Sequence, residues 1–132
     1  MTSYPLTTIA LVAVLLVYMW IAGQVGKARG VYGVQAPASS GHPEFDKRYR
    51  VQLNTVEQLV LLLPATFLAL PVLTDRWTAL AAAVFALGRV IYARAYWRDP
   101  KSRTLGFMLS LVPILVLMIA AVVGAVRTLA NI

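Results

Sequence analysis

The sequence contains no cysteine and a single histidine, and these two scarcities exclude several kinds of active site. Without cysteine the chain can form no disulfide, no thiolate nucleophile and no cysteine-ligated metal site, and the redox compartment stays undetermined. The histidine, His42, lies near Glu44 and Asp46 in a loop-like stretch, where a lone histidine is more often a solvated side chain than a ligand. No glycine-rich phosphate loop or serine elbow is present. We therefore expect no metal site and no nucleotide or acyl-enzyme chemistry.

Charged residues are also scarce, at 13% of the chain, whereas hydrophobic residues make up 60% and the mean hydropathy is +0.74. This balance is far from that of a soluble domain. Four stretches approach or exceed the roughly 20 apolar residues that a membrane-spanning helix needs, namely residues 4–23, 51–73, 77–96 and 104–126. The sequence predicts an all-α integral membrane protein, with residues 1–132 forming one domain of four transmembrane helices.

The connections between these stretches differ in length. Residues 30–43 are rich in Gly, Ser, Ala and Pro and show no helical or strand period, so they are predicted to form the one long loop. Residues 74–76 form a short connection, and Pro100 should end the third helix. No Lys or Arg precedes the first apolar stretch, which exceeds the roughly 7 to 15 residues of a signal-peptide core. We expect it to be a retained helix.

The net charge of +7 is distributed unevenly among the connections. Nine basic residues surround the first and third connections: Lys27, Arg29, Lys47, Arg48, Arg50, Arg94, Arg98, Lys101 and Arg103. The second connection and the carboxyl end carry only Arg76 and Arg127. The positive-inside rule then places the basic loops in the cytoplasm and both termini on the opposite side. Topology and attraction to anionic membrane lipids account for the charge, so we expect no nucleic-acid binding.

Polar residues nevertheless occur at the ends of two predicted helices. Arg50, Asn54 and Glu57 have i, i+4, i+7 spacing and share one helix face of about 60°. Near the end of the third helix, Arg89, Tyr92 and Tyr96 follow i, i+3, i+7 spacing, and Arg103 begins the fourth. Both groups lie toward the cytoplasmic ends of their helices. We predict that they face one pocket.

Each of these residues also has a structural interpretation. An ionisable group inside a span costs roughly 2.5 to 3.5 kcal/mol on insertion scales, so Glu57 and Arg89 could form an ion pair. Tyrosine and tryptophan at helix ends commonly form an interfacial belt, and basic residues there can be topology signals. The belt interpretation applies to Tyr92, Tyr96 and Trp97. The topology interpretation applies to Arg50, Arg98 and Lys101. A convergent pocket would instead bind carboxylates through arginine and an amine through Glu57, and an apolar second molecule could enter from the lipid.

The run RYRVQLNTVE, followed by GRVIYARAYW and then by an arginine, resembles the MAPEG family, the membrane-associated proteins in eicosanoid and glutathione metabolism. The similarity is greatest to the branch of microsomal glutathione transferases and leukotriene synthase. The preceding HPEFDKRYR also resembles a loop of that branch. The motifs cover residues 27–110, and the four-helix layout extends the likeness to the whole chain.

The resemblance implies a homotrimer of four-helix bundles that binds glutathione between subunits near the cytoplasmic face. Its glutathione-binding residues would be Arg29, Arg50, Gln52, Asn54, Glu57, Tyr92 and Tyr96. Of these, Arg29 and Gln52 would come from the same or the adjacent subunit. Arg103 occupies the position of the catalytic arginine that stabilises the glutathione thiolate. Lowering a thiol pKa of about 8.5 by two units needs roughly 2.7 kcal/mol, which an arginine in a partly desolvated pocket can supply.

Two positions depart from the leukotriene-synthase pattern: Gln58 replaces a tyrosine and Gly30 replaces an arginine. Leukotriene synthesis is therefore disfavoured. The expected function is glutathione conjugation to lipophilic electrophiles or reduction of lipid hydroperoxides, with glutathione as cosubstrate and no metal. The alternative is a non-catalytic lipid-binding scaffold of the same fold. A small multidrug transporter ranks third, because no charged residue precedes Lys27 in the first helix.

Overall fold

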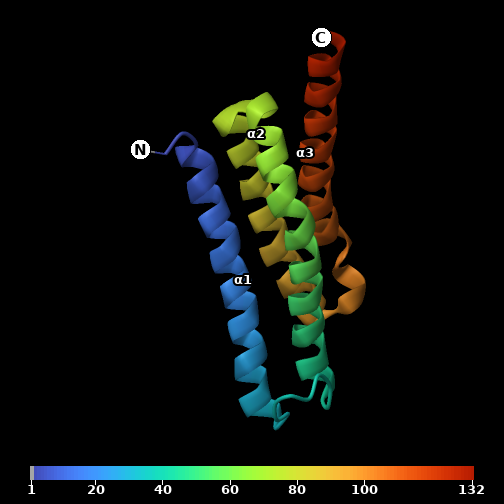
Figure 1. Ribbon diagram of the computed structural model, residues 1–132. Coiled ribbons are helices and arrows are strands. Elements are labelled where there is room, and N and C mark those ends of the chain that lie inside the picture. The colour runs from blue at the N-terminus through green and yellow to red at the C-terminus, as the bar shows by residue number, and fades with distance from the viewer. Residues whose placement is uncertain (1) are drawn as a thin grey trace.

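The computed structural model describes residues 2–132, which form three long helices and one short one. The long helices are α1 (Pro5–Tyr32), α2 (Pro43–Arg98) and α3 (Thr104–Ala130), and the 3-10 helix η1 spans Pro100–Ser102. Helix α2 packs against both α1 and α3 and lies between them (Figure 1). All three long helices are long and apolar enough to cross a membrane. The all-helical character predicted from the sequence is confirmed.

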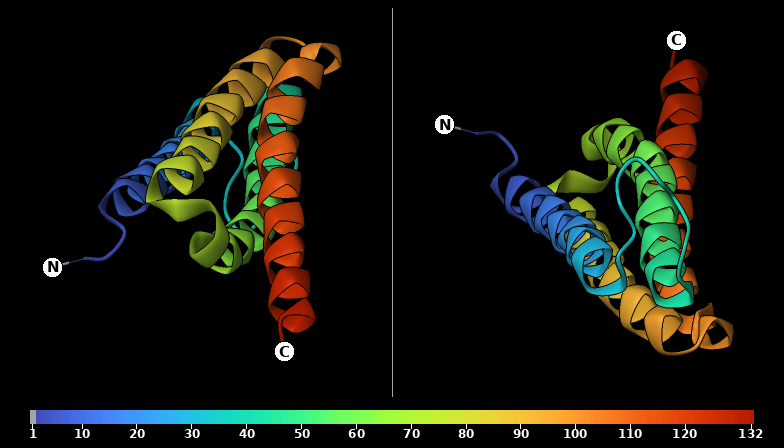
Figure 2. Two further views of the ribbon diagram at one scale, coloured as in Figure 1. Left: turned by 90° about the horizontal axis from the view of Figure 1, so that it is seen from above. Right: turned by 90° about the horizontal axis from the view of Figure 1, so that it is seen from below.

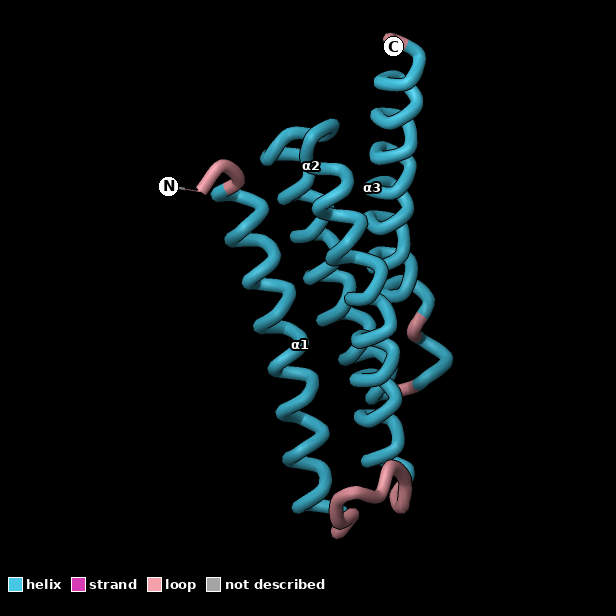
Figure 3. Tube along the Cα trace, in the orientation of Figure 1, coloured by secondary structure: helices cyan, strands magenta, loops and turns pink. Residues whose placement is uncertain are grey.

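The second and third predicted spans are joined across a kink within the single element α2, so the structure has three long helical elements in residues 2–132. Only Thr74 leaves the helical conformation, with φ of 68° and ψ of 167°, and the chain turns back on itself near this kink (Figure 3). The hydroxyl of Thr78 donates a hydrogen bond of 2.8 Å to the Thr74 carbonyl. Residues 74–76 are thus a kink rather than a loop. We call residues 43–73 the first arm of α2 and residues 75–98 its second arm.

The helices also extend further than the apolar stretches that predicted them. Helix α1 continues to Tyr32 and ends at Gly33, whose φ of 70° is a left-handed conformation that glycine adopts without strain. Helix α2 begins at Pro43, where His42 accepts a hydrogen bond of 3.1 Å from the Glu44 amide. His42 also stacks on Tyr32, so it is a helix cap rather than a solvated loop side chain. The long loop is therefore confined to residues 33–42, because α1 and α2 both extend beyond the apolar stretches that hydropathy marks.

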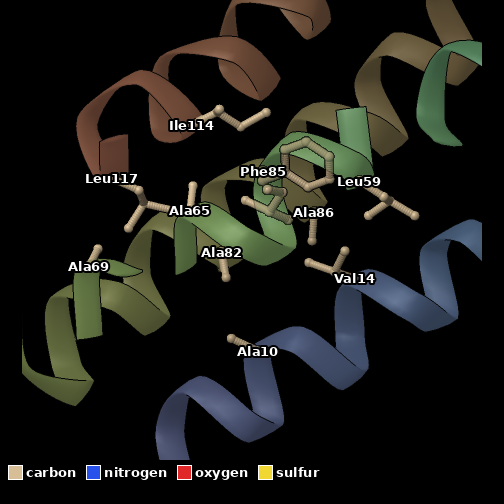
Figure 4. Close-up of a cluster of buried hydrophobic side chains, with 11 residues drawn as sticks. Ala10, Val14, Leu59, Ala65, Ala69, Ala82, Phe85, Ala86, Ile114 and Leu117 are labelled. Carbon is tan, nitrogen blue, oxygen red and sulfur yellow. The ribbon is translucent and has the colours of Figure 1, made fainter. Parts of the chain in front are cut away.

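The main core lies where both arms of α2 meet α1 and α3 (Figure 4). Many of its members are alanines, and small side chains let helix backbones approach closely inside a membrane. Larger side chains fill the space between the alanine contacts. The buried members are Ala10, Val14, Leu59, Leu62, Ala65, Ala69, Ala82, Phe85, Ala86, Ile114 and Leu117.

The two connections rich in basic residues lie at one end of the bundle, and the kink of α2 lies toward the other end with the two termini (Figures 1 and 2). Residues 33–42 join α1 to the first arm, and η1 joins the second arm to α3. The predicted end of the helix before Pro100 is confirmed, since α2 ends at Arg98. The assignment of the basic end to the cytoplasm stays a prediction.

The kink of α2 holds the beginning of α1. The two carboxylate oxygens of Asp75 accept hydrogen bonds of 2.9 Å from the Leu6 amide and 2.8 Å from the Thr7 amide. The Thr7 hydroxyl donates to the Asp75 carbonyl at 3.2 Å. A carboxylate at this place satisfies free amides of the first helical turn and interacts favourably with the helix dipole.

Replacement of Asp75 is therefore expected to loosen the contact between α1 and the kink. Desolvation acts to raise the pKa of Asp75, but the amide hydrogen bonds from Thr7 and Leu6 outweigh it and hold the pKa below its usual value. A depressed pKa contributes stability above the unfolded value of about 3.9, and this contribution disappears as pH falls through the folded pKa. Asp75→Asn should lower the melting temperature at pH 7 and flatten its decline below about pH 4. Thermal unfolding in detergent, followed by circular dichroism, measures both effects, and an unchanged slope in the variant would contradict the assignment.

Candidate functional site

A cavity of about 480 Å³ opens near the basic end of the bundle, between both arms of α2 and the beginning of α3. It is lined by Arg50, Asn54, Tyr92, Tyr96, Arg103, Thr104 and Phe107. Five of these residues come from the predicted set, although they lie on three separate segments of the chain. The helical spacing explains part of this convergence, since Arg50 and Asn54 are one turn apart on the first arm, as are Tyr92 and Tyr96 on the second.

The wall of the cavity is held by Arg89, a buried arginine of the second arm whose side chain is 1% exposed. Its Nη1 donates to Asn54 Oδ1 at 2.7 Å and its Nε donates to Ser110 Oγ at 2.8 Å. A longer bond of 3.4 Å reaches the Thr55 hydroxyl. Arg89 thus connects the first arm, the second arm and α3 in one network. Its Nη2 has no hydrogen-bond partner among residues 2–132.

The Arg89 network decides which atoms face the cavity. A guanidinium can only donate, so the carboxamide oxygen of Asn54 must point toward Arg89, which leaves the Asn54 amide nitrogen free to donate elsewhere. The guanidinium also lies 4.2 Å from the ring centre of Tyr92, which in turn packs at 5.7 Å against Tyr96. Because Tyr92 is only 4% exposed, it is a cavity wall and not part of a lipid-facing aromatic belt.

Three predicted site residues lie outside this cavity in the single chain. Glu57 is exposed, and no ion pair joins it to Arg89 in the described part of the chain, so the predicted Glu57–Arg89 pair is wrong. The Nε and Nη1 atoms of Arg89 donate to neutral side chains instead. Gln52 donates to the Tyr18 hydroxyl at 3.3 Å, and Arg29 donates to the Ala38 carbonyl at 2.7 Å.

Sequence reasoning missed Thr104 and Phe107 in the lining and Ser110 behind it. Phe107 follows Arg103 by one helical turn, so i, i+4 spacing from the arginine could have indicated it. Ser110 also donates to the Gly106 carbonyl at 2.7 Å, which fixes its hydroxyl for the bond from Arg89. A serine inside an apolar helix was the available signal for a buried polar contact.

The lining presents hydrogen-bond donors and positive charge without any acidic side chain. Arg50 and Arg103 are both exposed at the mouth, and the tyrosine hydroxyls and the Asn54 amide lie among them. Buried Arg89 adds positive potential from behind. Such a set favours a ligand that carries carboxylates or a thiolate.

Comparison with known proteins agrees with the motifs in the chain. The sequence model of the MAPEG family matches residues 6–123. An uncharacterized protein of Synechocystis sp. is 35% identical over 94% of this chain and 92% of its own length. Human microsomal glutathione S-transferase 2 is 36% identical over 70% of this chain and 63% of its own length, and bovine leukotriene C4 synthase is 32% identical over 74% and 65%. These matches, together with the three apolar helices, establish that the chain is a membrane protein of the MAPEG family.

Proposed function

We propose that this protein is a membrane-bound glutathione transferase that conjugates glutathione to lipophilic electrophiles or reduces lipid hydroperoxides. The observation that carries the proposal is the donor-lined cavity of Arg50, Asn54, Tyr92, Tyr96 and Arg103. Glutathione brings two carboxylates and an ionisable thiol, which are the groups that such a lining binds best. Relatives named as a glutathione S-transferase and as leukotriene C4 synthase support the same class of chemistry.

In this proposal the residues of the lining have separate roles. Arg50 binds a carboxylate of glutathione, while Asn54 and the two tyrosines donate neutral hydrogen bonds. Arg103 lies beside the sulfur and favours loss of its proton to water. The thiolate then attacks the electrophilic carbon, forming a carbon–sulfur bond as the leaving group departs with its electron pair. With a hydroperoxide, two glutathione thiols are oxidised to the disulfide, and the hydroperoxide is reduced to an alcohol and water.

We further propose that the working unit is a homotrimer. Arg29, Gln52 and Glu57 lie outside the cavity of their own chain, and contact with an adjacent subunit would place such residues at the rim of the neighbour's site. The cavity is open on one side, since Arg50 and Arg103 are both exposed. A second subunit over the mouth would exclude water and strengthen the electrostatic interactions inside.

The lipid-binding scaffold remains a second candidate because of an apolar groove of about 430 Å³ between the second arm of α2 and α3. Leu80, Val84, Met108 and Val112 contribute to its walls. Such a groove accepts a hydrocarbon chain whether or not the polar cavity activates a thiol. It also suits the apolar substrate of a transferase, so the two functions differ only at the polar cavity.

The first experiment is the ultraviolet difference spectrum of the detergent-purified protein on addition of glutathione at pH 7. A transferase should produce a thiolate absorption band, and the band should disappear when an alkyl halide or aryl halide is added and the conjugate forms. S-Methylglutathione, which has no ionisable thiol, is the matched control and should bind without a band. Binding of glutathione without a band, or no binding at all, would favour the scaffold.

A further inference from the structure

A second polar hollow lies on the other side of the second arm from the glutathione cavity, near the same end of the bundle. It has a volume of about 580 Å³ and is lined by Trp20, Gln24, Arg48, Arg94, Trp97 and Arg98. None of these residues lines the glutathione cavity. They come from α1, the first turns of α2 and the last turns of its second arm. We call this hollow the arginine cup.

Two tryptophans form the floor of the arginine cup, with arginines placed over them. The rings of Trp20 and Trp97 lie 5.2 Å apart, so α1 and the second arm meet through an aromatic contact. The guanidinium of Arg48 lies 5.6 Å from the ring centre of Trp97, and that of Arg94 lies 6.0 Å from Trp20. Cation–π contacts of this kind restrict the orientation of an arginine while its donors stay free for a ligand.

The charges of the cup are not neutralised equally. Arg48 is paired with Glu44 at 3.2 Å and also donates to the Glu44 carbonyl. Arg94 and Arg98 are exposed, and within residues 2–132 neither has a salt bridge or a hydrogen bond from its side chain. Two unpaired arginines beside a partly paired one leave a net positive cup that an anion would complete.

An apolar groove continues from the cup along α1 toward the middle of the membrane. This groove of about 300 Å³ shares Trp20 and Arg94 with the cup, and its remaining walls are Leu16, Val17 and Val90. Each of these three residues lies about one turn further from the basic end of its helix. The hollow is therefore polar and cationic at the bundle end and apolar beyond it.

We propose that the arginine cup and its groove bind one anionic phospholipid. The phosphate and acidic headgroup would contact Arg94, Arg98 and Gln24 in the cup, and an acyl chain would lie against Leu16, Val17 and Val90. Tryptophans at this depth are typical of the membrane interface, where a lipid phosphate is found. A soluble phosphate compound has no hydrocarbon chain and would leave the apolar part of the hollow unfilled. The bound lipid would join α1 to the second arm, and the proposal does not depend on glutathione chemistry.

The test uses the fluorescence of Trp20 and Trp97 in protein reconstituted into vesicles. The third tryptophan, Trp77, lies near the kink and is replaced by phenylalanine to remove its signal. Phosphatidylcholine vesicles receive increasing fractions of phosphatidylglycerol with brominated acyl chains, or of equally brominated phosphatidylcholine. We expect stronger quenching by the brominated phosphatidylglycerol at the same fraction, because bromine quenches only tryptophans that it contacts.

Arg94→Gln/Arg98→Gln should reduce the preference for phosphatidylglycerol over phosphatidylcholine by about 25-fold. Each basic residue near an anionic surface contributes about fivefold, and the variant removes two. The matched control is Arg76→Gln/Arg127→Gln, which removes the same charge from the opposite end and should keep the preference. Arg94→Lys/Arg98→Lys keeps the charge but loses bidentate hydrogen bonding, and we expect an intermediate value. Circular dichroism establishes that each variant is folded.

Three results would overturn the proposal. Equal quenching by both brominated lipids would show that the hollow does not select an anionic headgroup. An equal loss in the Arg76/Arg127 control would assign the preference to overall charge. Saturable binding of inorganic phosphate at millimolar concentration, without selective quenching by brominated phosphatidylglycerol, would assign the cup to a soluble anion instead of a lipid.

Discussion

Arg103→Ala is expected to lower the rate of glutathione conjugation at pH 7 by about 25-fold, because a thiol pKa two units higher reduces the ionised fraction of glutathione from about 76% to about 3%. Binding of glutathione should weaken much less, because Arg50, Asn54 and the two tyrosines stay in the cavity. The fold should also survive. Arg103 precedes α3 without capping it through its side chain, whose one hydrogen bond is a contact of 3.4 Å to the Pro100 carbonyl.

The free energy needed to lower the thiol pKa also constrains the surroundings of Arg103. A thiol with a pKa near 8.5 is about 3% ionised at pH 7, and a shift of two units requires roughly 2.7 kcal/mol. An exposed ion pair contributes only about 0 to 1 kcal/mol, and Arg103 is exposed in the single chain. Full activation therefore needs Arg103 to be covered, by glutathione itself and by the proposed neighbouring subunit. Detergents that dissociate the oligomer should abolish the thiolate band along with the activity.

The pH profile separates this role from a structural one. If Arg103 lowers the thiol pKa, the variant should recover much of its lost rate between pH 9 and 10, where glutathione ionises unaided. Lys101→Ala removes an exposed basic residue of the same connection that does not line the cavity, and it should behave as wild type. An Arg103→Ala enzyme with the wild-type rate at pH 7, or with the same loss at every pH, would refute thiolate stabilisation by Arg103.

The sequence predicted five of the seven residues that line the polar cavity, and helical spacing accounts for four of them because it is a local property. Arg50 with Asn54 and Tyr92 with Tyr96 each follow from one turn of helix, and hydropathy locates the helices themselves. Hydropathy did not locate their ends, since α1 and α2 continue past the apolar stretches that identified them. It did locate the reversal of the chain, since residues 74–76 were predicted to be a short connection and Thr74 is the residue that leaves the helical conformation.

The hydrogen-bond partners of the site residues were harder to predict than the residues that line the cavity. One interpretation paired Glu57 with Arg89 on formal charge, but in the described structure Arg89 donates hydrogen bonds to Asn54 and Ser110. Ser110 lies on α3, and its distance from Arg89 depends on how closely two helices pack rather than on spacing along one helix. Spacing along one helix also did not predict the placement of Arg29, Gln52 and Glu57. The family resemblance assigns these residues to glutathione, but in the single chain they lie outside the cavity.

Close packing of α3 against the second arm depends on Gly106, and Gly106→Ala is expected to disrupt both stability and the site. A Cβ atom at position 106 would overlap the backbone nitrogen and Cα of Tyr92 and lie 2.7 Å from its Cβ. Contacts under 3.0 Å are essentially absent from real structures, and backbone atoms cannot move aside as a flexible side chain can. Helix α3 must therefore shift away from the second arm.

The cost of this overpacking is about 1 to 3 kcal/mol of stability, against a gain of up to about 1 kcal/mol from the higher helix propensity of alanine. We expect a net loss, seen as a lower melting temperature in detergent. Gly23→Ala is the matched control, because Gly23 also lies inside a helix but a Cβ there would meet nothing within 4 Å. The control should be neutral or slightly stabilising.

The effect on function should exceed what lost stability explains. Arg103, Thr104 and Phe107 lie on or next to the first turn of α3, whereas Tyr92 lies on the second arm, so separation of the two helices widens the cavity. It also stretches the 2.8 Å bond between Arg89 and Ser110. Misplacement of binding groups by about 1 Å can cost 100-fold in rate. Gly106→Ala should therefore bind glutathione at least tenfold more weakly, even at temperatures where the variant is fully folded. Wild-type affinity in a folded Gly106→Ala protein would mean that the cavity does not depend on the close approach of these helices.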